Sequence, residues 1–295
     1  MKSLFLIVLL PLVVACDAGQ ERPEPVSASD GRTTTKPINA PVAQRIVSLA
    51  PNLTELAYQA GAGDKLVAAV EYSDYPPEAK ELPRIGDAFR IDFERLRQLQ
   101  PDLILVWESG NPKEMQLRIQ EMGFPVLVLE PSSLEDVASH IRAIGEMAGT
   151  PGVANVSAQA YLDKLDKVFS VYGAEPSVRV FYQISAAPWY TVNADHVISD
   201  IISRCGGINV FSDLTVLAPS VSPESVVATD PEVIIASVSS DRPADDWTAV
   251  WRRFSGVSAV RDEQFISVNS DLISRSSTRL ADGAEQLCRG LAAYR

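Results

Sequence analysis

The sequence has few histidines, few cysteines and too little positive charge for several classes of function. Two histidines, His140 and His196, occur among 295 residues, which leaves little material for a His-rich metal site or for acid–base chemistry at neutral pH. Acidic residues outnumber basic ones by 38 to 26, so the formal net charge is −12. This excess argues against a nucleic-acid partner, whose phosphates need a basic surface. It is compatible with an anionic face that meets a basic partner.

The apolar run near the N-terminus is too short to span a membrane. It extends from Leu4 to Val14, well below the ~20 residues that a transmembrane helix needs. Because Lys2 precedes the run and Val-Ala-Cys ends it, residues 1–15 are interpreted as a signal peptide. The small residue before Cys16 resembles a bacterial lipobox, in which the cysteine is diacylated and becomes the new N-terminus. The alternative is an ordinary signal peptide that is cleaved nearby, with Cys16 incidental.

The segment after Cys16 has the composition of a tether. Residues 16–43 are rich in Pro, Ser, Thr and charge and contain almost no large apolar residues, so they are expected to be flexible. Asp17 follows the cysteine, and by resemblance to other bacterial lipoproteins such a residue favours retention at the inner membrane. The expected location is therefore the periplasm, with the chain anchored to the outer face of the inner membrane through Cys16.

Cysteine is scarce, and the three residues divide by position. With Cys16 used for lipid, Cys205 and Cys288 remain. In an oxidising compartment these two are expected to form a disulfide, which would tie the Cys205–Gly207 segment to the final helix. The alternative is two buried free thiols, the commoner state in reducing compartments.

The remainder of the chain has ordinary globular composition and contains an internal repeat. Hydrophobic residues make up 46% and charged residues 22%, and the length accommodates two compact lobes or one large domain. A shift of 130 residues superposes Asp92–Leu105 on Ser222–Ile235. Each copy begins with an N-cap residue, has a Glu two positions later and passes through Pro-Asp or Pro-Glu into an apolar strand. The repeat suggests two similarly built lobes.

Strand and helix patterns alternate at short spacing, which indicates parallel βαβ units and an α/β fold. The predicted strands are 45–50, 65–70, 103–107, 125–130, 179–184, 233–237 and 265–268, and the predicted helices are 53–60, the repeated segments from 92 and from 222 to 229, 112–122, 132–147, 153–171, 195–204, 244–254 and 278–293. Residues 151–174 contain no apparent hinge, so a single long rigid helix is predicted to join lobes at 44–150 and 175–295.

Four groups of motifs resemble the periplasmic substrate-binding proteins of ABC importers for cobalamin and ferric siderophores. They are IVSLAPNLTELAYQAG at 46–61, YSDYPPEA at 72–79, IDFERLRQLQPDLILVW at 91–107, and the pair CGG at 205–207 with EQLC at 285–288. The resemblance covers about residues 44–295 and is greatest for the cobalamin-binding members. It implies two α/β lobes joined by one rigid helix, with the ligand in the cleft between them. No catalytic activity, cofactor or metal is expected.

The resemblance also implies how the chain meets its membrane partner. In the family an exposed glutamate on each lobe docks onto arginines of the permease, and the matching positions are Glu94 and Glu224. Two carboxylates on separate lobes would align a bilobed protein with a two-fold permease and steer association by charge. The alternative is that both carboxylates merely favour the helix dipole, which is worth ~0.3–1 kcal/mol.

Five cleft residues follow from the match to the cobalamin-binding members: Tyr72, Trp107, Tyr190, Asp271 and Arg275. Aromatic faces suit a broad, partly apolar corrin ring, while the two charged residues would meet its amide side chains. Trp107 ends an apolar strand, so a position in the core is an equal alternative. Phe89 and Trp189 are nearby candidates without a matching position.

Two departures from the family bear on the ligand. Tryptophans that line the cobalamin cleft in the family fall at Ala88 and Ala218 here. The loss leaves either a shallower grip on cobalamin or a different ligand. Cobalamin or a related corrinoid remains the first choice, and a ferric siderophore or haem is the alternative. Arg90 and Arg275 would serve an anionic iron complex, although no arginine cluster is evident.

An enzyme and a lipoprotein scaffold without a small ligand remain as weaker alternatives. Neither His140 nor His196 has the spacing of a nucleophile elbow or a metal site, so each is interpreted as structural or exposed rather than catalytic. Zinc and manganese importer proteins share a related architecture but need several histidine ligands. A lipoprotein scaffold without a small ligand would lack a well-formed cleft lined by aromatic residues.

Overall fold

The computed structural model describes residues 41–239 and 247–294. The predicted signal peptide, Cys16 and the tether up to residue 40 lie outside the described residues. Ala43, at the end of the predicted tether, is buried in the core and donates its N–H to the Met147 carbonyl at 2.9 Å. In the part of the chain that is described, no helix combines the length and the apolar character needed to cross a bilayer.

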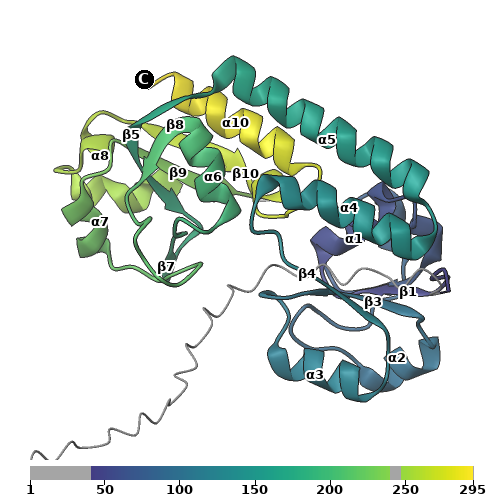
Figure 1. Ribbon diagram of the computed structural model, residues 1–295. Coiled ribbons are helices and arrows are strands. Elements are labelled where there is room, and N and C mark those ends of the chain that lie inside the picture. The colour runs from purple at the N-terminus through teal and green to yellow at the C-terminus, as the bar shows by residue number, and fades with distance from the viewer. Residues whose placement is uncertain (1–40, 240–246, 295) are drawn as a thin grey trace, which may run out of the picture. The chain divides into compact units, whose positions relative to one another are not determined.

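Two four-stranded parallel sheets with flanking helices form the two lobes (Figure 1). The N-terminal sheet has the strand order β2-β1-β3-β4, and its strands pair in parallel because a helix or loop returns the chain after each one. Its elements are β1 (Ile46–Ser48), α1 (Pro51–Gln59), η1 (Gly63–Lys65), β2 (Leu66–Ala69), η2 (Pro77–Glu81), α2 (Phe93–Leu99), β3 (Leu103–Trp107), α3 (Lys113–Glu121), β4 (Val126–Leu129) and α4 (Leu134–Ala148).

The C-terminal sheet has the order β8-β5-β9-β10, which is the same order once β5 is matched to β1 and β9 to β3. Its pairs are also parallel. Its elements are β5 (Ala174–Gln183), the hairpin β6 (Ser185–Ala186) and β7 (Trp189–Tyr190), α6 (Val197–Arg204), β8 (Cys205–Asn209), α7 (Pro223–Thr229), β9 (Val233–Val238), η3 (Trp247–Phe254), α8 (Ser258–Arg261), β10 (Phe265–Asn269), α9 (Ser270–Ile273) and α10 (Leu280–Ala292).

The repeated segment forms α2–β3 in one lobe and α7–β9 in the other. Asp92 caps α2 by accepting from the backbone N–H groups of Glu94 and Arg95, and Ser222 caps α7 by accepting from Ser225. Each helix ends at a left-handed residue, with φ of 45° at Gln100 and 43° at Asp230. These matching starts and stops confirm the sequence repeat at the level of backbone conformation.

The acidic residue after each repeated proline has one structural role in both lobes. Asp102 accepts from the backbone N–H of Arg45 at 2.8 Å, just before β1. Glu232 accepts from the backbone N–H of Arg179 at 2.8 Å, within β5. The carboxylate therefore fastens the incoming strand to its neighbour, which explains why the sequence carries an acid at both positions.

The helix α5 (Pro151–Tyr172) runs between the lobes, close to the predicted span of 153–171. It packs on α4 and on α10. Its buried positions repeat at three- and four-residue intervals, as expected for one apolar stripe on a helix: Ala154, Ala158, Tyr161, Leu165 and Val168. One continuous apolar core covers this stripe, α4, α10 and one face of each sheet.

The opposite faces of the two sheets have separate cores. Alternate residues of β3 point to opposite sides, so that Leu103 and Leu105 join the shared core while Ile104 and Val106 face α2 and α3. The outer core of the N-terminal lobe is aliphatic. The corresponding core of the C-terminal lobe is aromatic, and its large rings come from Phe181, Trp189, Phe211 and Trp251.

Several local predictions differ from the structure. The Cys205–Gly207 segment ends helix α6 as predicted, with Cys205 as the C-cap and Gly206 at φ 86°, but it also begins strand β8, which was not predicted. Residues 247–254 form a 3₁₀ helix rather than an α-helix, and 244–246 lie outside the described residues. The predicted disulfide is confirmed between Cys205 and Cys288 and joins β8 to α10.

Candidate functional site

A cavity of about 550 Å³ lies between the lobes, at the carboxyl ends of β3 and β4 and the start of α6. Crevices at the carboxyl ends of parallel strands are the usual binding sites of open α/β sheets. Its walls contain three carboxylates and, among their described residues, no lysine or arginine. They are formed by Trp107, Glu108, Ser109, Glu130, Pro131, Ser132, Asp195, His196, Val197, Leu217, Ile273, Ser274 and Ser276.

Trp107 is half-buried and lines this cavity, so it combines the two roles that the sequence left open. Its ring packs on Gly110, where an added Cβ would be 1.9 Å from the ring. Buried Asn111 holds the surrounding chain by accepting from the Trp107 N–H at 2.8 Å and donating to the carbonyls of Leu49 and Ala88 at 2.9 Å. Within the described chain the Trp107 indole N–H has no hydrogen-bond partner. The ring is thus fixed in place before any ligand arrives.

The other aromatic candidates fall into exposed and buried groups. Tyr72 is 75% exposed and Phe89 is 68% exposed on the N-terminal lobe, and Tyr190 is 38% exposed on the C-terminal lobe. Large exposed rings of this kind are available to a ligand. Trp189, by contrast, is buried among aromatic rings, with 4.6 Å between its centroid and that of Trp251. It belongs to the outer core and does not offer a face to a ligand.

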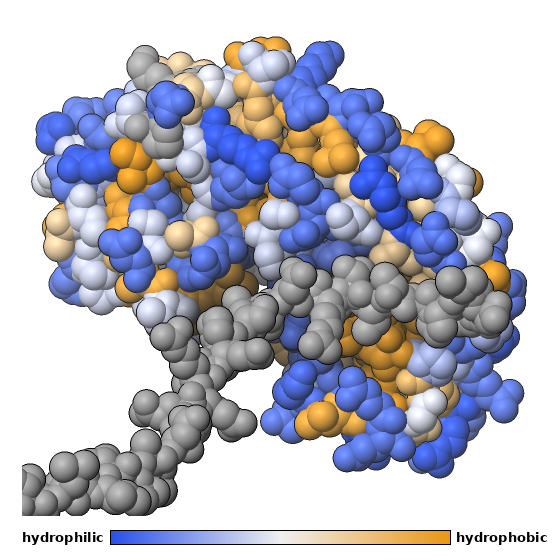
Figure 2. All heavy atoms as spheres, in the orientation of Figure 1, coloured by the Kyte–Doolittle hydropathy of each residue, from blue (hydrophilic) through white to orange (hydrophobic). Residues whose placement is uncertain are grey.

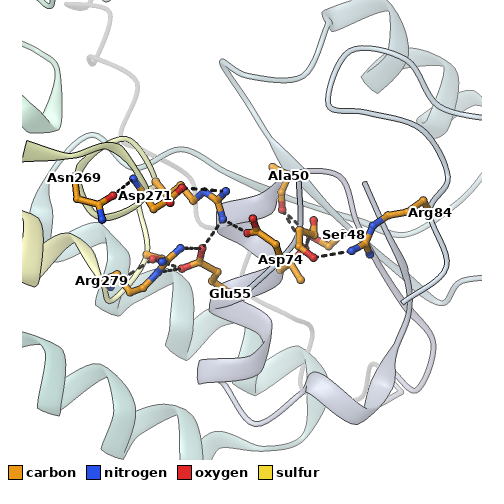
Figure 3. A network of polar contacts seen from close by, with 12 residues as sticks. Ser48, Ala50, Glu55, Asp74, Arg84, Asn269, Asp271 and Arg279 are labelled. Atoms are coloured by element: carbon orange, nitrogen blue, oxygen red, sulfur yellow. Dashed lines mark hydrogen bonds and ion pairs between the residues drawn. The ribbon is translucent and has the colours of Figure 1, made fainter. Parts of the chain in front are cut away.

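An ion-pair network joins the lobes, and Figure 3 shows Glu55, Asp74 and Arg279 in it. Arg275 belongs to the same network. Its guanidinium contacts Glu55 of α1 at 3.2 Å and Asp74 at 2.5 Å, both from the N-terminal lobe. Asp271, one turn earlier, contacts the same guanidinium at 3.4 Å. The two charged residues predicted to bind ligand therefore lie together, but Arg275 is already surrounded by three carboxylates.

Glu55 is the centre of this network, because its side chain is only 2% exposed. It also accepts from Arg279 at 2.5 Å and from the Ser277 hydroxyl at 2.6 Å. A buried carboxylate is tolerated only when it is paired and hydrogen-bonded. The side chains that pair with Glu55, those of Arg275, Ser277 and Arg279, come from the opposite lobe. Glu55 consequently links helix α1 of the N-terminal lobe to the segment between α9 and α10 of the C-terminal lobe.

The charges of the network reinforce one another. Burial raises the pKa of Asp74, but the hydrogen bond and positive charge of Arg275 outweigh it and hold that pKa below its ordinary value. Burial lowers the pKa of Arg275, and the hydrogen bond and charge of Asp74 more than compensate, so that the pKa is raised. Both groups stay ionised at neutral pH, and the positive charge of Arg275 is paired with carboxylates of the protein itself.

His196 stands between the cavity described above and a second cavity of about 710 Å³ beside α6 and β8. It is the N-cap of α6, and its Nδ1 accepts from the Ile198 N–H at 3.2 Å. Burial lowers its pKa to about 4, so the imidazole is neutral at physiological pH. The two cavities have Ser132, Asp195 and His196 in common.

The two glutamates of the repeat are exposed and lie in the first turns of α2 and α7. Within residues 41–239 and 247–294, neither Glu94 nor Glu224 forms an ion pair. The pKa of Glu224 is lowered by a backbone hydrogen bond, by the Ser222 hydroxyl and by the charge of Arg253. Both carboxylates therefore present a negative charge to solvent. The face of the molecule seen in Figure 2 is largely hydrophilic, with separate hydrophobic patches.

The sequence reasoning missed Glu55, Asp74 and Arg279 and assigned no binding role to His196. A signal existed for Glu55, which lies next to Leu56 in the apolar run 53–60 of a short helix. A charged residue in such a run implies a buried partner. Nothing local indicated that the partner lies 220 residues away. Ala88 is partly buried and Ala218 exposed, and neither lines the cavity between the lobes.

The amino-acid sequence matches a known protein family and individual relatives over most of its length. Residues 46–272 match the periplasmic binding protein family. The chain is 38% identical over 246 residues to a vitamin B12-binding protein of Vibrio cholerae serotype O1, covering 83% of this chain and 88% of that protein. It is 34% identical over 253 residues to a vitamin B12-binding protein of Yersinia pestis, covering 86% of this chain and 88% of the relative.

Solved structures show the same architecture. The periplasmic vitamin B12-binding protein BtuF of Vibrio cholerae matches with a TM-score of 0.78 at 36% identity, over 86% of this chain and 99% of that one. The periplasmic heme-binding protein RhuT from Roseiflexus matches with a TM-score of 0.71 at 22% identity, over 85% of this chain and 98% of that one, which shows the fold alone. These relatives are binding proteins rather than enzymes, and their family indicates a periplasmic location. With two matching α/β lobes, a cavity between them and a family match over most of its length, the chain belongs to the periplasmic binding protein family.

Proposed function

We propose that this protein binds cobalamin or a related corrinoid between its lobes and delivers it to an ABC permease. The vitamin B12-binding relatives at 34–38% identity support this choice. So do the exposed rings of Tyr72 and Tyr190, and Trp107 at the cavity wall. These rings would cover the faces of a broad, partly apolar macrocycle. Asp271 would contribute a polar contact at the edge.

The charge of the cleft is the observation that carries the choice of ligand. Three carboxylates, those of Glu108, Glu130 and Asp195, line the cavity between the lobes. Arg275 lies close by but is already paired with three carboxylates. Haem and the ferric catecholate siderophores are anionic and would meet repulsion here. A corrinoid bears mostly uncharged carboxamide side chains, which can donate hydrogen bonds to carboxylates.

This charge balance also revises the part played by Arg275. The guanidinium holds the wall of the cleft through Asp74 and Glu55, so in this proposal it orders the site and touches the ligand only at an edge. Arg90 is exposed and does not line the cavity. The two arginines that would favour an anionic iron complex are therefore not gathered at one place.

Delivery is assigned to Glu94 and Glu224. Both are exposed, and they stand at equivalent positions of equivalent helices in the two lobes. Two matching negative charges suit a two-fold permease that presents a basic residue to each lobe. In the same proposal Cys16 is lipidated and residues 17–40 tether the binding unit to the inner membrane.

Calorimetry with cyanocobalamin tests the proposed function. The chain without residues 1–16 should bind one equivalent of cyanocobalamin with micromolar or tighter affinity. Ferric enterobactin and hemin, both anionic and titrated in parallel, should bind more weakly by at least an order of magnitude. Folded protein that ignores cyanocobalamin but binds hemin or the ferric siderophore would refute the corrinoid assignment and leave the family membership intact.

A further inference from the structure

The walls of the interlobe cavity are rich in hydrogen-bond acceptors and have few nitrogen donors. Carboxylates supply acceptors only, and serine hydroxyls can both accept and donate. Among the described lining residues only Trp107 and His196 carry a side-chain N–H group. The Trp107 indole nitrogen is wholly buried and has no partner in the described chain, which leaves the imidazole as the ring donor at the cavity wall. A ligand that offers acceptors therefore meets serine hydroxyls and the His196 imidazole as side-chain donors.

The N-cap contact fixes which nitrogen of His196 can donate. A neutral imidazole has one N–H and one lone pair. The Nδ1 atom uses its lone pair to accept from the Ile198 N–H at 3.2 Å, so the proton is on Nε2. Among residues 41–239 and 247–294, the Nε2 atom of His196 has no hydrogen-bond partner. The ring lines both cavities, and its free N–H is thus available to a ligand.

We propose that His196 is a ligand-contacting residue that donates a hydrogen bond from Nε2 to a carboxamide oxygen of the bound corrinoid. This inference rests on the proposed function and deepens it. A primary carboxamide presents two N–H donors and one acceptor oxygen. Its N–H groups match the carboxylates of Glu108, Glu130 and Asp195, and its oxygen matches the His196 donor. The same wall thereby offers partners to both the N–H donors and the acceptor oxygen of the carboxamide.

The same geometry makes His196 a poor axial ligand for a metal. Binding a metal through Nε2 would move the proton to Nδ1, where it would face the Ile198 N–H instead of accepting from it. The first turn of α6 would then lose its cap. Burial further favours the neutral ring, because it lowers the pKa of His196 to about 4. The histidine consequently recognises the periphery of the corrin rather than its cobalt.

A cap-preserving variant tests this assignment. His196→Ser keeps an N-cap acceptor but has no donor that reaches as far, so the variant should unfold at the wild-type temperature. Its affinity for cyanocobalamin should be about three- to tenfold weaker, as expected for one lost hydrogen bond. His140→Ser is the matched control, because that histidine is buried in α4 and lines neither cavity. It should bind cyanocobalamin with wild-type affinity.

The outcomes separate the two proposals. If the wild type binds and His196→Ser binds equally well, the inference is wrong while the proposed function stands. If the wild type does not bind cyanocobalamin, the proposed function fails and the inference with it. Aquacobalamin gives a second readout, because an imidazole that replaces its axial water changes its visible spectrum. We expect no change on binding; a change in the wild type that His196→Ser abolishes would show coordination and overturn the donor role.

Discussion

The two lobes have the same strand order but are stabilised differently. On the outer face of the N-terminal sheet the buried core is formed by aliphatic side chains and methionine, for example Ile104 and Met115. On the equivalent face of the C-terminal sheet, Phe181, Trp189 and Trp251 pack as a cluster of rings with centroids 4.6–6.2 Å apart. The C-terminal lobe also has the disulfide. Topology is therefore shared, while the chemistry of the core is not.

This difference shows which features a βαβ lobe requires. Both copies keep a helix cap, a left-handed helix end and a carboxylate that fastens the next strand, because these settle the direction and register of the backbone. The apolar side chains behind the sheet only need to fill the available volume. The two lobes can therefore share the features that settle the backbone and differ in the apolar side chains behind the sheet.

The largest expected effect concerns the pair of exposed glutamates. Glu94→Ala combined with Glu224→Ala should abolish permease-coupled uptake, because each lobe then loses the charge that docks it in the proposed function. Cyanocobalamin binding should persist, since neither residue lines the cavity. Uptake assays and calorimetry on the two single variants and the double variant measure both effects. Equal losses in the singles would show that the lobes dock equivalently; normal uptake by the double variant would make the repeat purely structural.

Glu55→Ala tests the contact between the lobes. It leaves Arg275 and Arg279 without their buried partner, so the free energy of unfolding should fall by about 3–5 kcal/mol. Asp74→Asn changes a carboxylate on the same arginine that is 48% exposed, and should cost no more than about 1 kcal/mol. Chemical denaturation of both variants provides the measurement. Similar costs for the two would mean that burial does not set the strength of this network.

Removal of the disulfide should affect the lobes unequally. Cys205→Ser with Cys288→Ser frees a loop of 83 residues and should lower the free energy of unfolding by about 2–5 kcal/mol. Hydrogen exchange should accelerate in β8 and α10, which the bond joins, more than in β3 of the other lobe. Uniform acceleration across both sheets would indicate that the shared core transmits the loss to the whole unit.

The effect of pH is smallest near neutrality and grows on acidification, because each lobe has one histidine with a lowered pKa. For His196 the folded value is about 4, against 6.5 as its ordinary value, and burial is the cause. Between these values the unfolded chain binds the extra proton, so stability decreases as pH falls, by up to ~1.4 kcal/mol per pH unit. His196→Ser should flatten this slope. For His140 burial also lowers the pKa, and His140→Ser should act in the same direction. A slope unchanged in both variants would assign the acid sensitivity to carboxylates.

The local elements followed from the sequence because their signals are local. The α2 and α7 caps at Asp92 and Ser222 and the apolar strand at Leu103–Trp107 were all recognisable without a partner. Strand β8 was not, because the segment does end α6 as its glycines indicate, and its pairing with β5 is a tertiary event. The disulfide was predictable because two cysteines remained for one compartment.

The amino-acid sequence by itself determined the two-lobe plan, the long connecting helix, the cystine and the positions of the exposed glutamates. Only the tertiary structure decided which charged and aromatic residues are available to a ligand. It paired Arg275 with Glu55 across the lobes, buried Trp189 among rings and left the Nε2 of His196 without a hydrogen bond in the described chain. The physical reason is range: capping and periodicity act over a few residues, whereas burial and ion pairing depend on segments that folding brings together.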